Sequence, residues 1–413
     1  MDPRTAIRSR SPHLVLVGGG HAMLPLVKHA GTWTARGVAI TLVDESDALF
    51  YSGMVPEHLG GVYASEQVRV DLRRLCAASG VAFTQSRVTG LSLDPPGVVL
   101  ASGETLPCDL AALDVGGVNP KRDAAGDAIP TKPLHHIEAL ERFVRDALDR
   151  ESGTQHLAIV GGGAAGVEVA LNVSARVGAT RPDALRLTLF EPADSLLPNV
   201  PAGMQREALR LLEQRGVTVT LSTRVEAAEN GEVVLADGTR IAADRVLWAT
   251  GTAGPPLFRE SGLPVDDAGF LRVADTMQCP SAPWLFAAGD CAALDSYPDL
   301  KKIGVNAVKQ GPLLRDNIAR ALDALLADRS LGDLDLSAFT PYPLTPLILS
   351  TGEPEGLWVS GRLWLRGGPI LRLKHTVDRR WMRKYSPAWR RRPLLDLFDR
   401  EAAATDRAST SVS

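Results

Sequence analysis

The 413 residues are enough for two or three domains that each bury a core, and 45% hydrophobic with 23% charged residues is typical of a globular protein. The net charge of −3 gives no excess of positive charge that would favour nucleic acid as a partner. Four cysteines without a closely spaced pair argue against a disulfide scaffold and a zinc site, so we expect no metal centre and a reducing, cytoplasmic location. No stretch reaches the ~18 apolar residues of a transmembrane helix.

The first predicted element is an apolar strand, Leu14–Val17, which enters the glycine-rich turn of "LVLVGGGHAM". Gly18 and Gly20 occupy the first two positions of a G-x-G-x-x-G fingerprint, but Met23 stands at the third. Such glycines let the backbone approach a pyrophosphate at a helix N-terminus. Because Met23 keeps helix and strand apart, we expect a slightly displaced helix. The next strand, "AITLVDES", ends in Asp44, whose carboxylate suits ribose hydroxyls.

A stretch typical of a β-meander follows, and the whole plan then recurs. Turn residues fall at matching places in the two meanders, such as Pro95-Pro96-Gly97 in the first and Asn230-Gly231 in the second. Both meanders close with an aspartate, an apolar strand and a glycine turn, at Gly116 and Gly251, which are 135 residues apart. This duplication predicts two dinucleotide-binding units.

The second glycine loop lies in "HLAIVGGGAAGVEVA", where Gly161, Gly163 and Gly166 complete the fingerprint. The strand after it, "LRLTLFEP", ends in Glu191. An acid at a strand end is often only a solvated charge, but its repetition after a second loop favours ribose binding. Glu191 would repel a 2′-phosphate and "FEPADS" offers no basic residue to accept one, so we expect NADH to be preferred to NADPH.

Two dinucleotide units in one chain indicate a flavoenzyme with FAD in one unit and NAD(H) in the other. In "APWLFAAGDCA" an apolar strand runs into Gly289 and Asp290, whose carboxylate suits the ribityl or phosphate end of FAD. We therefore predict an α/β fold of two Rossmann-like domains. The NAD domain (136–270) is inserted in the FAD domain (12–135 and 271–335), and a C-terminal segment (336–413) follows.

From about Leu14 to Ile318 the chain resembles the two-dinucleotide-binding-domain flavoproteins of the pyridine nucleotide-disulfide oxidoreductase superfamily. "VLWATG" and "LFAAGDCA" are similar to the later fingerprints of that class. More narrowly, "GGGHAM", "YSGMVPEHLGGVY", "KIGVNAVKQGP" and "LILSTGEPEG" resemble type II NADH dehydrogenases and the flavoprotein module fused to selenophosphate synthetases.

The resemblance implies roles on the flavin side. The stretch Tyr51–Pro56 would pass along the isoalloxazine, and His21 and Ala22, which follow the phosphate loop, would contact phosphate or flavin. For His21 a packing role is equally open.

It also implies roles near the reacting groups. Glu168, in the "GVE" motif, would lie near nicotinamide and flavin, although a glutamate in the first helical turn is also favoured by the helix dipole alone. Lys302 and Gln310 belong to the segment that leads a helix N-terminus to the flavin, and Gln310 matches a glutamine that lines the quinone pocket of type II enzymes.

Disulfide reductases of this class carry a redox cysteine pair after the acidic strand end. Here that segment, "ALFYSGMVPEHL", has no cysteine. Neither Cys108 nor Cys279 lies in a motif that places it at the flavin, and Cys291 is expected to be a small buried residue. A disulfide relay is therefore not expected.

The tail from Arg372 to Arg392 has nine Lys or Arg and one Asp, interleaved with Trp381, Tyr385 and Trp389. A solvated helix face is one interpretation, and peripheral attachment to an anionic membrane, at the inner face of the cell membrane, is the other. We predict no nucleic-acid partner.

Our functional hypothesis is that hydride passes from NADH to FAD and that electrons then pass to a quinone. Two alternatives stay open. One is an NADH-dependent reductase of a protein partner or of a selenium or sulfur species, and the other is a non-enzymatic FAD/NAD-binding redox sensor.

Overall fold

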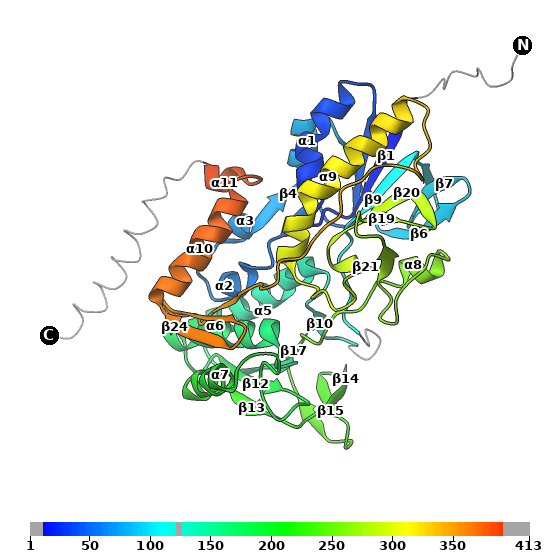
Figure 1. Ribbon diagram of the computed structural model, residues 1–413. Helices are drawn as coiled ribbons and strands as arrows, with labels where there is room; N and C mark the ends of the chain where they lie inside the picture. Colours follow the sequence, from blue (N-terminus) through cyan, green and yellow to red (C-terminus); the bar gives the residue numbers. More distant parts are fainter. Residues whose placement is uncertain (1–10, 121–125, 391–413) are drawn as a thin grey trace, which may run out of the picture.

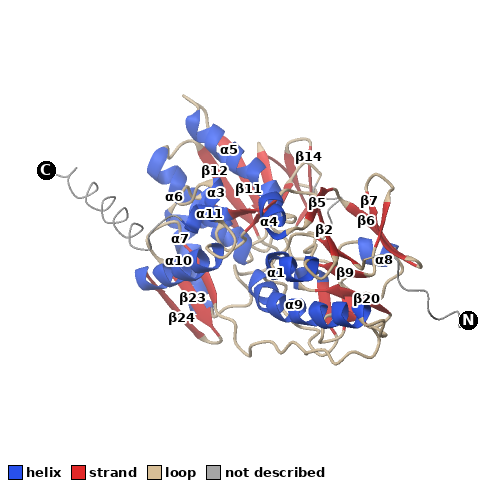
Figure 2. Cartoon of the chain, turned by 90° about the horizontal axis from the view of Figure 1, so that it is seen from above, coloured by secondary structure: helices blue, strands red, loops and turns tan. Residues whose placement is uncertain are grey.

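Two neighbouring α/β units make up most of the molecule (Figures 1 and 2). The computed structural model describes residues 11–120 and 126–390. One unit is built on a six-stranded sheet and the other on a five-stranded sheet, and a three-stranded C-terminal sheet packs on the second unit. The predicted α/β fold with two Rossmann-like units is confirmed.

The six-stranded sheet combines strands from widely separated parts of the chain. Its order is β19 (Gln278–Cys279), β20 (Ala282–Ala287), β9 (Leu110–Leu113), β1 (His13–Val17), β2 (Ala39–Asp44) and β5 (Ala82–Gln85). All neighbours run parallel except β19 and β20. Strands β1 and β9 are almost wholly apolar and buried, as expected for a parallel sheet covered on both faces. Helix α1 (Leu24–Thr34) packs on α4 (Leu72–Ser79) and α9 (Gly304–Leu326).

The five-stranded sheet is parallel throughout and lies within the middle of the chain. Its order is β10 (Ile129–Pro130), β17 (Arg245–Trp248), β11 (Gln155–Val160), β12 (Leu185–Phe190) and β13 (Thr218–Thr220). Its helices are α5 (Ile137–Asp149), α6 (Ala164–Thr180) and α7 (Ala202–Gln214). Strand β10 already belongs to this sheet, although it precedes residue 136, where the predicted NAD domain begins.

Each unit carries a three-stranded antiparallel meander. The first comprises β6 (Val88–Leu93), β7 (Pro96–Leu100) and β8 (Thr105–Pro107), and the second comprises β14 (Val225–Glu229), β15 (Glu232–Leu235) and β16 (Arg240–Ala242). Between β14 and β15, Asn230 and Gly231 both have positive φ, 54° and 74°, which is the two-residue hairpin geometry that this dipeptide favours.

The duplication extends to buried side chains. At the start of β1, the His13 ring donates from Nδ1 to the carbonyl of Pro107, and its backbone N–H donates to Asp109 Oδ2 at 2.8 Å. At the start of β11, the His156 ring and backbone N–H make the same bonds to Ala242 and to Asp244 Oδ2. In both units the ring thus ties the first strand to the end of the meander.

The C-terminal segment closes over the second unit. It consists of β22 (Leu347–Ser350), β23 (Gly356–Ser360), β24 (Leu363–Gly367), α10 (Gly368–Met382) and α11 (Pro387–Arg390). Strand β22 contacts α6, and β24 contacts α7. Helix α10 runs back along the first unit near the short helix α2 (Figure 1).

Short elements connect these layers. They are β3 (Ala48–Phe50), α2 (Val55–Leu59), α3 (Ser65–Val68), β4 (Arg69–Asp71), the 3-10 turn Leu134–His136, α8 (Leu257–Glu260), β18 (Leu271–Val273), the 3-10 turn Gly289–Cys291 and β21 (Ala292–Leu294).

Candidate active site

The two glycine loops follow the carboxyl ends of β1 and β11. Gly18 and Gly161 have φ of +82° and +114°, and a Cβ on either would overlap the carbonyl oxygen at the end of a neighbouring strand, so both positions require glycine. Gly166 is equally constrained, because a Cβ there would overlap the carbonyl oxygen of Gly161. The position of Gly166 in the first loop belongs to the buried Met23, and α1 begins only at Leu24.

Each predicted ribose-binding acid is anchored to its own glycine loop. Asp44 accepts a hydrogen bond from Gly19 N–H at 2.5 Å, and Glu191 accepts one from Gly162 N–H at 2.6 Å. Burial raises the pKa of Asp44, against the lowering effect of its backbone hydrogen bonds. The repeated geometry brings both acids to the loop edge where a dinucleotide ribose lies in this fold.

The glycine turns that close the two units lie side by side. Val118 and Ala253 form an antiparallel bridge just after Gly116 and Gly251. The buried Asn119 amide donates to the carbonyl of Thr250 at 2.7 Å, which clamps the two turns together. The carboxyl edges of the two sheets are therefore adjacent.

The Gly289–Asp290 turn reaches the same region. Gly289 N–H donates to Gln310 Oε1 at 2.7 Å, so the predicted Gln310 side chain supports this turn from α9. Asp290 pairs with Lys132 at 2.5 Å. Lys132 was not predicted, because no local pattern indicates that it meets an acid 158 residues away. The predicted Lys302 lies just before α9 and donates instead to the carbonyl of Ala292.

An aromatic cluster lies beside the first glycine loop. Tyr51 and Trp381 stack with ring centroids 4.5 Å apart, and His21 lies 5.5 and 5.2 Å from them. Burial lowers the pKa of His21 to about 4, with Asp290 opposing, so this imidazole is neutral at pH 7. Its buried Nε2 atom has no hydrogen-bond partner within the described chain. The first residue of α9 is also close, because a Cβ on Gly304 would lie 3.0 Å from Ser52 Oγ.

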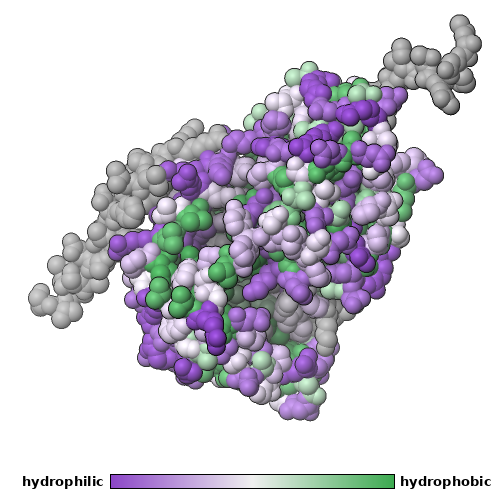
Figure 3. All heavy atoms as spheres, viewed as in Figure 1, coloured by the Kyte–Doolittle hydropathy of each residue, from purple (hydrophilic) through white to green (hydrophobic). Residues whose placement is uncertain are grey.

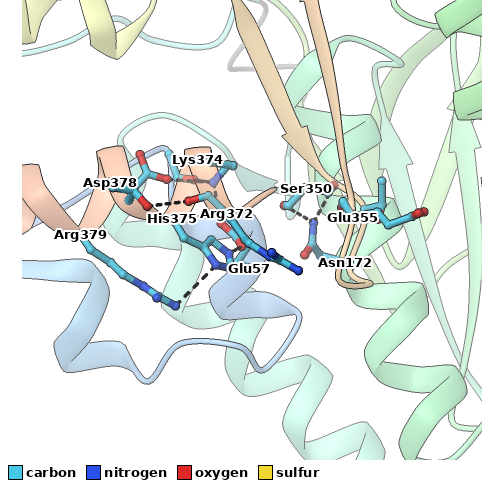
Figure 4. Close-up of polar contacts among 12 residues, drawn as sticks. Glu57, Asn172, Ser350, Glu355, Arg372, Lys374, His375, Asp378 and Arg379 are labelled. Atoms are coloured by element: carbon cyan, nitrogen blue, oxygen red, sulfur yellow. Dashed lines mark hydrogen bonds and ion pairs between the residues drawn. The ribbon is translucent and has the colours of Figure 1, made fainter. Parts of the chain in front are cut away.

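Glu168 is buried in α6 and is held by the C-terminal sheet. Its Oε1 accepts hydrogen bonds from Ser350 N–H at 2.7 Å and from Ser350 Oγ at 2.9 Å, and Asn172 supports the same serine (Figure 4). Burial raises the pKa of Glu168 to about 7, although Lys374 and Ser350 favour its charged form. The glutamate therefore exchanges its proton near neutral pH.

A buried ionic cluster joins α10 to the segment Tyr51–Pro56 (Figure 4). The Lys374 ammonium donates to Glu57 at 2.5 Å, to Asp378 at 3.1 Å and to the carbonyl of Gly53. His375 donates to the second oxygen of Glu57. Burial disfavours the Lys374 charge, but its carboxylate neighbours outweigh this and raise its pKa. Burial likewise opposes ionisation of Glu57, yet Lys374 and His375 lower its pKa overall.

Sequence reasoning missed Lys374, Glu57 and Asp378 as members of the site. Only the i,i+4 spacing of Lys374 and Asp378 could have indicated an ion pair, and it could not have shown that both face the protein interior. Tyr51 completes the cluster by donating its hydroxyl to Asp378 at 3.0 Å.

The tail prediction needs correction. Trp381, Tyr385 and Trp389 are at most 9% exposed, and Lys374 and Arg379 are buried as well, so these residues form neither a solvated face nor a set of interfacial aromatics. The reason is that α10 packs its polar residues against other polar residues of the first unit rather than against water. Of the predicted stretch, Arg391 and Arg392 lie outside the described residues.

What α10 does expose is a mixed surface. Leu373 and Val377 are 52% and 54% exposed, with Arg372, Arg380 and Lys384 exposed around them. Leu363 and Leu365 of β24 are also exposed, and Figure 3 shows apolar surface over the region that β24 occupies in Figure 1. In the described part of the chain, no helix combines the length and apolarity needed to cross a bilayer.

The four cysteines are all buried and none is in a disulfide. Burial raises the pKa of the Cys76 thiol to about 12 and also raises that of Cys291. Such thiols are poor nucleophiles. Within residues 11–120 and 126–390, no group of His, Cys, Asp or Glu side chains could hold a metal ion.

The residues present fit two dinucleotides. A Cβ on Gly163 would meet nothing within 4 Å, which leaves the open space that a diphosphate needs at the N-terminus of α6. On the other side, the unpartnered His21 Nε2 faces a cluster made by the first loop, the Tyr51 segment and α9.

Residues 12–311 match the family described as pyridine nucleotide-disulphide oxidoreductase. The chain belongs to this family. Its members are FAD-dependent NAD(P)H oxidoreductases, so the predicted superfamily, enzyme class and cofactors FAD and NAD(H) are confirmed.

Curated relatives and solved structures agree with this assignment. Demethylphylloquinone reductase NdbB of Synechocystis sp. is 28% identical, covering 68% of this chain and 72% of that protein. A type II NADH:quinone oxidoreductase of Haemophilus influenzae is 26% identical, covering 68% of this chain and 74% of its own. The structure of NDH2 from Plasmodium falciparum superposes with a TM-score of 0.73 over 92% of this chain and 96% of that chain, at 13% identity, which shows a shared fold.

Proposed function

We propose that this flavoprotein oxidises NADH and passes the electrons to a quinone. The carrying observation is that the carboxyl edges of both sheets meet at a site that contains a titratable buried glutamate, Glu168, and no reactive thiol. The names of the NdbB and Haemophilus relatives support quinone as the acceptor class. When bound, FAD supplies the redox chemistry between the two substrates.

The second unit binds NADH in this proposal. The open backbone at Gly163 and the N-terminus of α6 hold the diphosphate, where the helix dipole favours negative charge. Glu191 accepts hydrogen bonds from the adenosine ribose and disfavours a 2′-phosphate. Glu168, one turn into α6, lies at the end of the site where the nicotinamide approaches the flavin.

The first unit binds FAD. Gly18 and Gly20 line the diphosphate path, Asp44 accepts from the ribose, and Asp290 with Lys132 lies at the ribityl or phosphate end. The peptide segment from Tyr51 to Pro56 runs along the isoalloxazine and is held in place by Lys374, through the carbonyl of Gly53.

Reduction of a quinone consumes two protons, and Glu168 is placed to supply one. A general acid works best when its pKa lies near the working pH, and burial brings that of Glu168 to about 7. Ser350 holds the Oε1 atom through two hydrogen bonds, which orients the carboxyl group. Burial disfavours the loss of a proton from Glu168. The ammonium of Lys374 partly offsets this effect, because it stabilises the charged carboxylate.

Anaerobic mixing tests the reaction in two steps. NADH should bleach the visible absorbance of the bound flavin. A water-soluble quinone, mixed in as the second step, should restore that absorbance. A flavin that NADH bleaches but quinone does not reoxidise, while a disulfide, a selenium species or a protein acceptor does, would favour the reductase alternative. A flavin that NADH does not bleach on the timescale of turnover would favour a redox sensor.

A membrane surface is the proposed source of the quinone. The exposed Leu373 and Val377 would enter the interface while the surrounding basic side chains meet anionic headgroups, at about 1 kcal/mol for each basic residue near the surface. The sequence hypothesis instead placed Trp381, Tyr385 and Trp389 at the membrane interface, but these aromatic residues are buried.

Co-sedimentation with vesicles of anionic lipid tests this surface. The double substitution Leu373→Ser with Val377→Ser should reduce binding, whereas Leu326→Ser, an exposed leucine at the far end of α9, should not. Binding of the unmodified protein should also fall at 1 M salt, where the Debye length is ~3 Å. Equal sedimentation of both variants and the unmodified protein would show that α10 does not contact the membrane.

A further inference from the structure

The residue directly after the strand beside each glycine loop differs between the two units. In the second unit this position is Ala249, whose methyl group cannot accept a hydrogen bond, and the space beside Gly163 is open. In the first unit the same position, 135 residues earlier, is Asp114, at the end of β9. At this strand-end position, therefore, only the first unit has an acid.

The Asp114 carboxyl fills the space that is open in the second loop. A Cβ on Gly20 would overlap this carboxyl group, and so would a Cβ on Gly289, so the acid lies between two predicted cofactor-binding glycines. Its Oδ2 accepts a hydrogen bond from Ala22 N–H at 2.8 Å. Ala22 N–H belongs to the turn before α1, where backbone N–H groups point toward a bound diphosphate in this fold.

We propose that Asp114 couples FAD binding to protonation. The acid lies where the diphosphate approaches the first glycine loop, and only its neutral form is compatible with that dianion. This inference rests on the proposal that the first loop binds FAD. When FAD binds to protein with an ionised Asp114, one proton is taken from solvent; when it binds to protein with a neutral Asp114, no proton moves.

The surroundings of Asp114 support a neutral acid. Burial, Asp290 and Asp44 raise its pKa, whereas the Ala22 N–H bond and Lys132 lower it, and the balance lies at about 7. The other groups facing this corner are the neutral thiol of Cys291 and, behind it, the ammonium of Lys302. A bound diphosphate adds negative charge and raises the pKa of Asp114 further.

The test is the affinity of the full-length, cofactor-stripped protein for FAD between pH 6 and pH 9, measured by flavin fluorescence. With a free-protein pKa of about 7 and a value well above the tested pH range in the complex, the unmodified protein should bind FAD about 30-fold more weakly at pH 8.5 than at pH 6. Asp114→Asn, which is neutral at every pH, should show no such loss. Calorimetry in two buffers of different ionisation enthalpy should detect uptake of one proton at pH 8.5 in the unmodified protein and none in the variant.

Two further variants keep the test decisive. Asp114→Ala introduces the residue that the second unit has at this position, Ala249. It replaces Asp114→Asn in the test if the asparagine variant does not fold. Asp109→Asn changes an acid at the other end of β9, which bonds His13 instead of the glycine loop, and should keep the pH dependence of the unmodified protein. Equal pH profiles with and without Asp114 would overturn the role of this acid while leaving FAD binding intact. Failure of the unmodified protein to bind FAD at any pH would overturn the placement of FAD as well.

Discussion

Substitution of Lys374 by methionine tests how α10 is docked on the flavin-side segment. Lys374 is 5% exposed, and its ammonium compensates Glu57 and Asp378, which are 1% and 6% exposed. Methionine keeps the length of the side chain but leaves the buried Glu57 with His375, and the buried Asp378 with the neutral Tyr51 hydroxyl, as their remaining partners. Removing one member of a buried ion pair costs about 3–5 kcal/mol. We expect a loss of that size in the free energy of unfolding at pH 7 to 8.

The sign of the pH dependence follows from the pKa shifts. The folded-state pKa of Glu57 is lowered, so its contribution is present above its unfolded pKa and is lost as the pH falls. That of Lys374 is raised, so its contribution is present below its unfolded pKa and is lost only as the pH rises further. In Lys374→Met the carboxylates protonate more readily, so the deficit relative to the unmodified protein should be largest at pH 7 to 9 and should shrink toward pH 5.

Urea denaturation of the flavin-loaded protein at several pH values measures these free energies. Arg380→Met, an exposed change on the same helix, should cost no more than about 0.5 kcal/mol. The double substitution Lys374→Met with Asp378→Asn should recover part of the loss, because it removes one of the unpaired charges. A loss below about 1 kcal/mol for Lys374→Met at pH 8 would refute the argument, since a buried and uncompensated carboxylate destabilises the folded state by more than this.

Three further predictions concern the NADH side. Glu168→Gln should lower quinone turnover by about 10²-fold and abolish the fall in rate as the pH rises through about 7, and an unchanged pH profile of kcat would exclude a proton-donating role. Glu191→Ser should narrow the preference for NADH over NADPH in kcat/KM, and a wild type that uses both equally would show that this acid does not face the ribose. Gly166→Ala should weaken NADH binding in a titration because its methyl group would overlap the carbonyl of Gly161, whereas Gly178→Ala in the same helix, with open space around it, should not.

The sequence by itself determined the duplicated α/β plan, because the features that specify it are local. Gly18 and Gly161 are recognisable since only glycine tolerates their positive φ beside a strand-end carbonyl, and the acids at Asp44 and Glu191 follow at a fixed place in the next strand. The Asn-Gly hairpin at residue 230 likewise follows from backbone conformation alone.

Tertiary structure alone decided which distant groups meet. The pairs Lys132–Asp290 and Lys374–Glu57 join residues 158 and 317 positions apart, and no local pattern encodes such contacts. The tail shows the same limit most clearly: a run rich in arginine and lysine predicts a solvated or membrane-bound face, yet Lys374 and Trp381 are buried. Whether a charged helix faces water or the interior depends on whether the opposing surface supplies counter-charges and hydrogen-bond acceptors. Here Glu57 supplies the charge and the Gly53 carbonyl an acceptor, and both lie far away in sequence.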